Sequence, residues 1–178
     1  MQKLISYNAN DKASFSLEAD IHLTGPELVL EFSLKDPQGL FELPKTTAAW
    51  SRSQVARQDG LWQATCFEAF LQPSGQAKYY EFNFALNPAW NGYEFTAYRE
   101  PQPPKATADF VLKAMSWNSE QKHLIVRFEN KSGATKFQAG LTAILQEKSG
   151  IKHYYAVAHK GPKPDFHLSE SFILQRGS

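Results

Sequence analysis

Two acidic residues and an amide lie close together within residues 59–84 of this 178-residue chain. Trp62 precedes a strand-like run that carries Glu68, and a second run a short turn later carries Glu81 and Asn83. Carboxylate and amide oxygens accept hydrogen bonds from vicinal hydroxyl groups, and an indole face packs on the C–H face of a sugar ring. These residue types therefore indicate a binding site for a small polar ligand.

Alternation along the two runs decides which of these side chains share a face. Successive side chains of a strand point to opposite faces, so Glu68 shares a face with Cys66, and Glu81 shares one with Asn83. The linker over residues 72–78 is short, which predicts that the runs are hairpin neighbours with Glu68 close to Glu81 or Asn83. The alternative is an ordinary solvated sheet face, with Trp62 in the core.

Further candidates follow in "NPAWNGYEFTAYR". Trp90 lies between two turn signals, and a large aromatic residue on a loop tip is suited to be a ligand platform. The alternative is a tryptophan that folds back to cap the core. Tyr98 and Arg99 end the following run, and we expect them at the same end of the sheet.

His159, Asp165 and His167 lie in the proline-containing segment "AVAHKGPKPDFHL". His and Asp side chains are potential metal ligands, but this spacing matches no established motif, so no metal site is predicted. Two prolines reduce the entropy lost on binding, which favours a polar binding rim. The alternative is that Asp165 caps a turn and the histidines are solvated or hydrogen-bonded.

Two other kinds of site stay open. Glu68 and Glu81 match the paired carboxylates of a glycosidase, which needs a fixed separation and a raised pKa on one of them. A haem site would need axial ligands such as Met115 with one of the histidines. Nucleophile-elbow, P-loop and glycine-rich dinucleotide motifs are absent from the sequence, and Cys66 in an apolar run is typical of an inert core residue.

Composition excludes several classes of protein. The chain is 42% hydrophobic and 21% charged, with a net charge of +1, which predicts one globular domain over residues 1–178 and no nucleic-acid or membrane partner. The single cysteine allows no internal disulfide and no cysteine-based zinc site. The first residues lack the apolar region of a secretory signal, so we expect a cytoplasmic protein unless a signal was removed.

Period-two alternation of apolar residues dominates the chain and predicts an all-β fold. The clearest runs cover residues 15–23, 28–34, 80–86, 124–128 and 137–145, with shorter ones near the end. Turn residues separate them, which indicates a two-sheet antiparallel β-sandwich, immunoglobulin-like or jelly-roll, with a closed barrel as the alternative. Residues 46–58 are expected to form a short helix or an irregular loop.

The segments "DGLWQATCFEAFL", "YYEFNFALNPAWNGYEF" and "YAVAHKGPKPDFH" resemble the DOMON-like domains grouped with family 9 carbohydrate-binding modules. The resemblance covers nearly the whole chain and implies a sandwich with two sheets of about five strands each. It also implies that Trp62 and Glu68 help to hold the end of a sugar chain. A second aromatic residue completes such sites, and Phe166, Tyr155 or His167 would take that place here, because no tryptophan follows Trp117.

The same resemblance has implications for cofactors and source. Family 9 modules often carry calcium, but no Asp-rich loop is present here, so calcium is not predicted. Other DOMON relatives bind haem, but a pair of axial ligands is not evident in this sequence, so haem is not predicted either. This subgroup resembles freestanding bacterial proteins.

The sequence thus predicts a non-catalytic module that binds a saccharide. The predicted aromatic platforms are Trp62 and Trp90. Hydroxyl groups of the ligand would donate to Glu68, Glu81 and Asn83. The predicted rim consists of Tyr98, Arg99, His159, Asp165 and His167.

Overall fold

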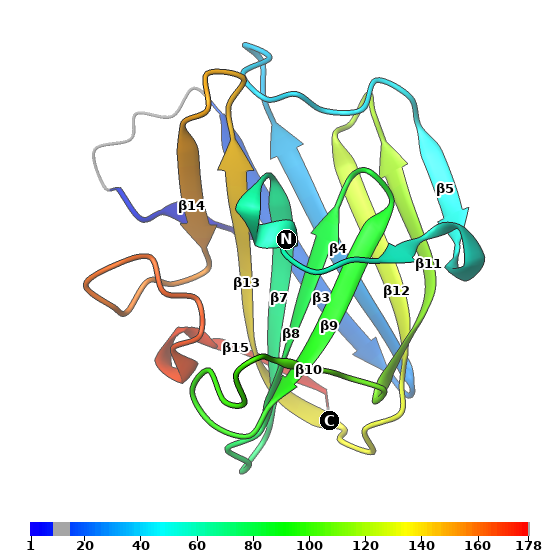
Figure 1. Ribbon diagram of the computed structural model, residues 1–178, viewed down its shortest axis with the longest axis vertical. Coiled ribbons are helices and arrows are strands. Elements are labelled where there is room, and N and C mark those ends of the chain that lie inside the picture. Colours follow the sequence, from blue (N-terminus) through cyan, green and yellow to red (C-terminus); the bar gives the residue numbers. More distant parts are fainter. Residues whose placement is uncertain (9–14, 178) are drawn as a thin grey trace.

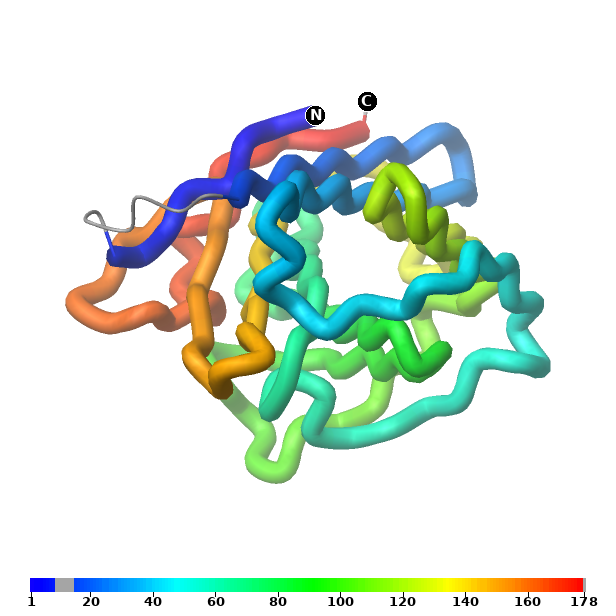
Figure 2. The backbone as a smooth tube through the Cα atoms, turned by 90° about the horizontal axis from the view of Figure 1, so that it is seen from above, coloured from blue at the N-terminus to red at the C-terminus, as the bar shows by residue number. Residues whose placement is uncertain are grey.

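The computed structural model describes residues 1–8 and 15–177, which form two β-sheets packed face to face as two layers (Figure 1, Figure 2). The predicted β-sandwich is therefore confirmed. The first sheet has six strands, in the order β1 (Gln2–Lys3), β3 (Ser16–Thr24), β4 (Glu27–Lys35), β12 (His123–Asn130), β11 (Phe110–Asn118) and β5 (Ala48–Ser51).

The second sheet has nine strands, so the two sheets are larger and less equal than the implied five strands each. Its main path is β10 (Lys105–Ala106), β9 (Ala89–Phe95), β8 (Tyr79–Ala85), β7 (Cys66–Pro73), β13 (Lys136–Gln146), β14 (Lys152–Ala156) and β2 (Ile5–Ser6). Two short strands pair beside it: β15 (Leu174–Gly177) with β13, and β6 (Ala56–Arg57) with β9, the latter in parallel.

Short segments of 3₁₀ helix connect some of these strands: η1 (Arg52–Gln54), η2 (Leu61–Gln63) and η3 (Ser169–Ser171). Residues 46–58, expected as a helix or loop, instead contain β5 and β6 separated by η1. Among the described residues, no helix has the length and apolar character needed to cross a membrane.

The core lies between the inner faces of the two sheets. The alternating residues Tyr80, Phe82 and Phe84 of β8 point into it and meet apolar residues of the first sheet, among them Phe128 at 5.3 Å from Phe82 between ring centroids. Burial of such side chains is the main favourable contribution to folding.

The outer face of the second sheet is covered as well, which is why nearly every residue of β7 and β8 is buried. The covering segments are residues 96–104, between β9 and β10, and residues 157–173, between β14 and β15 (Figure 1). A second apolar cluster forms beneath them, in which Tyr79 stacks on Phe95 at 4.9 Å and Phe70 on Phe172 at 5.6 Å.

Gly140 of β13 lies directly beneath Phe172 of the cover. A Cβ atom at this position would lie 2.9 Å from Cδ1 of Phe172. Gly140→Ala should therefore lower the free energy of unfolding by about 1–3 kcal/mol, the usual cost of overpacking. Urea denaturation measures it.

A double-mutant cycle tests the cause. In a Phe172→Ala background the ring is gone, so the added cost of Gly140→Ala should fall well below its cost in the native chain. Equal costs in both backgrounds would show that the two residues do not interact.

Candidate functional site

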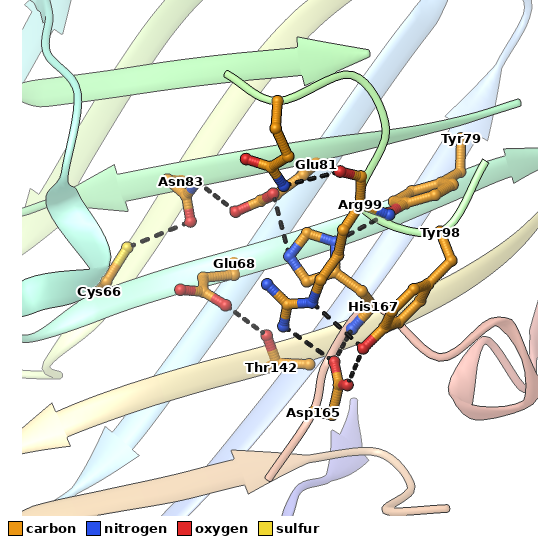
Figure 3. Close-up of polar contacts among 11 residues, drawn as sticks. Cys66, Glu68, Tyr79, Glu81, Asn83, Tyr98, Arg99, Thr142, Asp165 and His167 are labelled. Carbon is orange, nitrogen blue, oxygen red and sulfur yellow. Dashed lines mark hydrogen bonds and ion pairs between the residues drawn. The ribbon is translucent and has the colours of Figure 1, made fainter. Parts of the chain in front are cut away.

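The β7–β8 hairpin brings the predicted acidic residues together on the outer face of the second sheet. Glu68 pairs with Asn83 and Phe70 with Glu81 in the antiparallel register, and Thr142 of β13 lies opposite Glu68 on the other side. The prediction that the two runs are hairpin neighbours is confirmed. In Figure 3 the side chains of Glu68 and Glu81 lie beside Arg99 and His167, which belong to the two covering segments.

A cavity of about 230 Å³ lies between this face and its cover. Six of the residues predicted for a ligand site line it: Trp62, Glu68, Glu81, Arg99, Phe166 and His167. Other aromatic and apolar side chains complete the lining, including Tyr93, Phe95 and Tyr154. The combination of an apolar wall with a few convergent polar groups is typical of ligand sites.

Glu68 and Glu81 form the acidic floor of this cavity. Glu68 is 3% exposed and accepts a hydrogen bond from Thr142 Oγ1 at 3.1 Å. Glu81 is 7% exposed, accepts one from Asn83 Nδ2 at 2.7 Å, and has Oε2 3.5 Å from His167 Nε2.

Burial shifts the protonation of both carboxyl groups. It raises the pKa of Glu68 to about 8, with the charge of Glu81 as the next cause, and it raises the pKa of Glu81 to about 7. Burial and the mutual repulsion of the two carboxylates therefore both favour the protonated form of the floor.

Asn83 and Cys66 support the floor from below and stay out of reach of a ligand. Asn83 is fully buried; its amide nitrogen donates to Glu81 and its Oδ1 accepts from Cys66 Sγ at 3.6 Å. Burial raises the pKa of the Cys66 thiol, so it stays protonated. Asn83, predicted as a direct acceptor for the ligand, instead orients Glu81.

The two covering segments are joined by the carboxylate of Asp165. It accepts hydrogen bonds from Tyr98 Oη at 2.5 Å and from Arg99 Nη2 at 3.0 Å. The backbone N–H of His167 donates to the same carboxylate at 3.1 Å. Burial alone would raise the pKa of Asp165, but the hydrogen bonds from Tyr98 and Arg99 outweigh it and the pKa is lowered.

Tyr79 sets the orientation of His167. Its hydroxyl accepts from the backbone N–H of Arg99 at 3.0 Å and lies 2.8 Å from His167 Nδ1. Burial, followed by the charge of Arg99, lowers the pKa of His167 to about 4, so the ring is neutral. Because the Tyr79 hydroxyl already accepts a hydrogen bond from the Arg99 amide, it donates its own proton to His167 Nδ1. The proton of the neutral imidazole is then on Nε2, which faces Glu81.

The prediction that Trp90 lies on a loop tip is wrong. The residue lies within β9 rather than on a loop tip, and it pairs with Phe84, whose side chain faces the core. It is 5% exposed, with its ring 5.1 Å from Phe128 and the Arg57 guanidinium 4.4 Å from the ring centroid. Trp90 is one of the β9 residues whose side chains point to the inner face of the sheet, on the side opposite to the cavity.

His159 is also not brought to the cavity. Its Nε2 lies 3.0 Å from the carbonyl oxygen of Ile5, and its ring contacts Tyr7 at 5.3 Å between centroids. Tyr98 and Asp165 act on the cavity indirectly, through Arg99. Met115, named as a possible haem ligand, is fully buried within the main core.

Several residues of the site were not predicted from the sequence. Tyr93 stands beside Trp62, with ring centroids 6.2 Å apart, and its hydroxyl donates to Asp59 Oδ1 at 2.6 Å. Asn91 donates to the same oxygen at 2.8 Å. The alternation of "NGYEF" would have placed Asn91, Tyr93 and Phe95 on one face, but the partner Asp59 is distant in sequence.

Comparison with known proteins supports the fold. No family model matches the chain, and no curated protein matches it either. The crystal structure of "a putative carbohydrate-binding protein" from Bacteroides uniformis ATCC 8492 is similar, with a TM-score of 0.68 and 14% sequence identity over 99% of this chain and 84% of that one. The resemblance to DOMON-like and family 9 modules stays a prediction.

The raised pKa values of the floor make stability depend on pH. A carboxyl group whose pKa is higher in the folded state stabilises that state at low pH, and this contribution is lost as pH rises through about 7 to 8. Glu68→Gln removes the group that must ionise while buried, so at pH 9 the variant should be more stable than the native protein by on the order of 3 kcal/mol.

Urea denaturation at pH 5 and pH 9 measures this difference. The exposed Glu120→Gln serves as the control and should follow the native curve. A Glu68→Gln variant whose stability falls between pH 5 and pH 9 as much as the native protein's would refute the assignment.

The role of Asp165 can be tested without a ligand. Asp165→Asn leaves the Arg99 guanidinium without its counter-charge, so we expect faster amide hydrogen exchange in both residues 96–104 and 157–173, and a loss of about 1–3 kcal/mol of stability. Asp36→Asn is the matched control, because buried Asp36 accepts two backbone N–H groups in a distant turn. Faster exchange in only one covering segment would show that Asp165 does not join them.

Proposed function

We propose that this protein is a non-catalytic binding module for a small saccharide or the end of a glycan chain. The observation that carries the proposal is an exposed indole beside buried hydrogen-bonding groups in one cavity. Trp62 is 40% exposed on η2, at the rim of the cavity whose floor holds Glu68 and Glu81. An aromatic face and a set of oxygen acceptors match the two sides of a sugar, its C–H face and its hydroxyl groups.

The remaining lining supports the same kind of ligand. Arg99 and the Nε2 proton of His167 donate hydrogen bonds, so the cavity offers donors as well as acceptors. Its volume of about 230 Å³ is small for a ligand site, which favours a single ring or a chain end. The description of the B. uniformis protein is consistent with this class of ligand.

A glycoside hydrolase is the second candidate, and the raised pKa of Glu68 favours it, because a general acid must keep its proton at neutral pH. Hydrolysis also needs two carboxyl groups that flank the scissile bond. Here both groups rise from adjacent strands of one floor, and Glu81 is held by Asn83 and His167. This arrangement favours binding over hydrolysis.

Calorimetric titration with a panel of monosaccharides and short oligosaccharides tests the proposal. At least one saccharide should bind. Trp62→Ala should lower the affinity for it by about tenfold or more, and a tenfold loss equals about 1.4 kcal/mol of binding free energy. Trp50→Ala is the control, because half-buried Trp50 lies on β5 of the other sheet.

Two results would count against the proposal. If no saccharide gave a binding heat, the proposed function would be refuted. If Trp62→Ala and Trp50→Ala bound the saccharide with equal affinity, the proposed role of the Trp62 indole would be refuted. Release of aryl alcohol from aryl glycosides, lost in Glu68→Gln, would support the hydrolase instead.

A further inference from the structure

The floor of the cavity contains two carboxyl groups and no cation that belongs to them. Thr142 and Asn83 give them neutral hydrogen bonds, and the nearby His167 ring is neutral. Among residues 1–8 and 15–177, no lysine or arginine forms an ion pair with Glu68 or Glu81. Buried carboxylates are normally paired, so this floor is incomplete in charge.

Arg99 does not supply the missing charge. It lines the cavity, and its charge lowers the pKa of both glutamates to some extent. Two of its three guanidinium nitrogens, however, donate to Asp165 at 3.0 Å and to Tyr98 at 3.3 Å on the side of the covering segments. The Asp165 carboxylate therefore offsets part of the Arg99 charge, and two ionised glutamates would outnumber the positive charge that remains.

Other groups around the floor are uncharged at neutral pH. Burial raises the pKa of the Cys66 thiol on β7, and it raises that of the Tyr79 hydroxyl on β8 to about 12. It also raises the pKa of Tyr93 on β9 above its ordinary value. Thr142 on β13 adds only a neutral hydroxyl group. Ionised, the floor therefore makes the cavity anionic.

The walls are suited to a cation as well. Trp62, Tyr93, Phe95, Tyr154 and Phe166 surround the same space. Aromatic faces attract ammonium groups through their quadrupole. A cavity with a carboxylate floor and aromatic walls matches a positively charged amine from both sides.

We propose that the ligand carries an ammonium group, which binds over Glu68 and Glu81 and neutralises their charge. The saccharide part of this statement rests on the proposed function, and the ligand is then an amino sugar with a free amine. Ammonium N–H groups donate to both carboxylates, and one proton leaves the floor to solvent for each cation bound. Uronic acids and other anionic sugars are excluded by the same charge.

The proton release fixes the direction of the pH dependence. Below about pH 7 the floor is protonated and a cation must displace a proton, so affinity for an ammonium group should rise with pH up to about 8. A sugar without an amine has no reason to release a proton, and its affinity should change little over the same range.

Calorimetric titrations of the full chain with five probes test the inference: D-glucose, D-glucosamine, 6-amino-6-deoxy-D-glucose, D-glucuronic acid and butylamine. One of the two amino sugars should bind at least about tenfold tighter than D-glucose at pH 7.5. Its affinity should rise by up to about tenfold per pH unit between pH 6 and pH 7. Buffers of different ionisation enthalpy should report release of a proton for that sugar and none for D-glucose.

Variants link the effect to the floor. Glu68→Gln and Glu81→Gln should each remove most of the preference for the amino sugar and the proton release. Glu120→Gln, exposed in the β11–β12 turn, should keep both. Circular dichroism at pH 7.5 confirms that each variant is folded.

The outcomes separate this inference from the proposed function. Binding of D-glucose at equal or higher affinity than both amino sugars, or tighter binding of D-glucuronic acid, would overturn the ammonium while leaving the saccharide. If butylamine bound as tightly as the amino sugars, the result would support recognition of an ammonium group and overturn the proposal that the ligand is a saccharide. Absence of heat with all five probes would overturn both.

Discussion

One buried carboxylate, that of Asp165, holds the arrangement on which the cavity depends. It collects hydrogen bonds from Tyr98, Arg99 and the backbone of His167, and so joins two segments that would otherwise lie separately on the outer face of the second sheet. Its own charge is retained, because these donors outweigh the cost of burial. The cover that it holds has the opposite effect on Glu68 and Glu81, which lose water and gain too few donors, so that their pKa values rise. The same cover therefore keeps Asp165 ionised and raises the pKa values of Glu68 and Glu81 toward neutral pH.

The rigidity of the floor comes from burial on both faces of the same strands. Inner residues of β8 pack in the main core, while Tyr79 on the outer side stacks on Phe95 within the second cluster. A side chain between two packed layers has few rotamers, so Glu81 keeps its position without a ligand, and Asn83 fixes it further. Such preorganisation lowers the entropy lost on binding. The aromatic wall is fixed in the same way, since Asp59 holds the Tyr93 hydroxyl.

Local patterns in the sequence were sufficient for the strands and for the β7–β8 hairpin. The alternation in "YYEFNF" and the short linker before it predict that Glu68 lies close to Glu81 or Asn83 across the strand pair, and the register places it opposite Asn83. The same alternation, extended through "AWNGYEF", would have placed Trp90 opposite Phe84 and inside the core, but the turn residues around it suggested a loop tip. The cover could not be predicted from local patterns. Arg99 meets Asp165 across 66 residues of sequence, and only tertiary packing turns a sheet face into a cavity.

The charge of the floor connects the architecture to the kind of ligand. A buried pair of carboxyl groups has two ways to avoid an uncompensated charge, which are to keep a proton or to gain a cation. Among the described residues the fold provides hydroxyl, amide and neutral imidazole donors but no cation for the pair, so the empty cavity keeps the proton. A hydroxyl group of a ligand leaves that proton count unchanged, whereas an ammonium group replaces the proton. The number of protons released on binding therefore distinguishes the two kinds of ligand even where their shapes are the same.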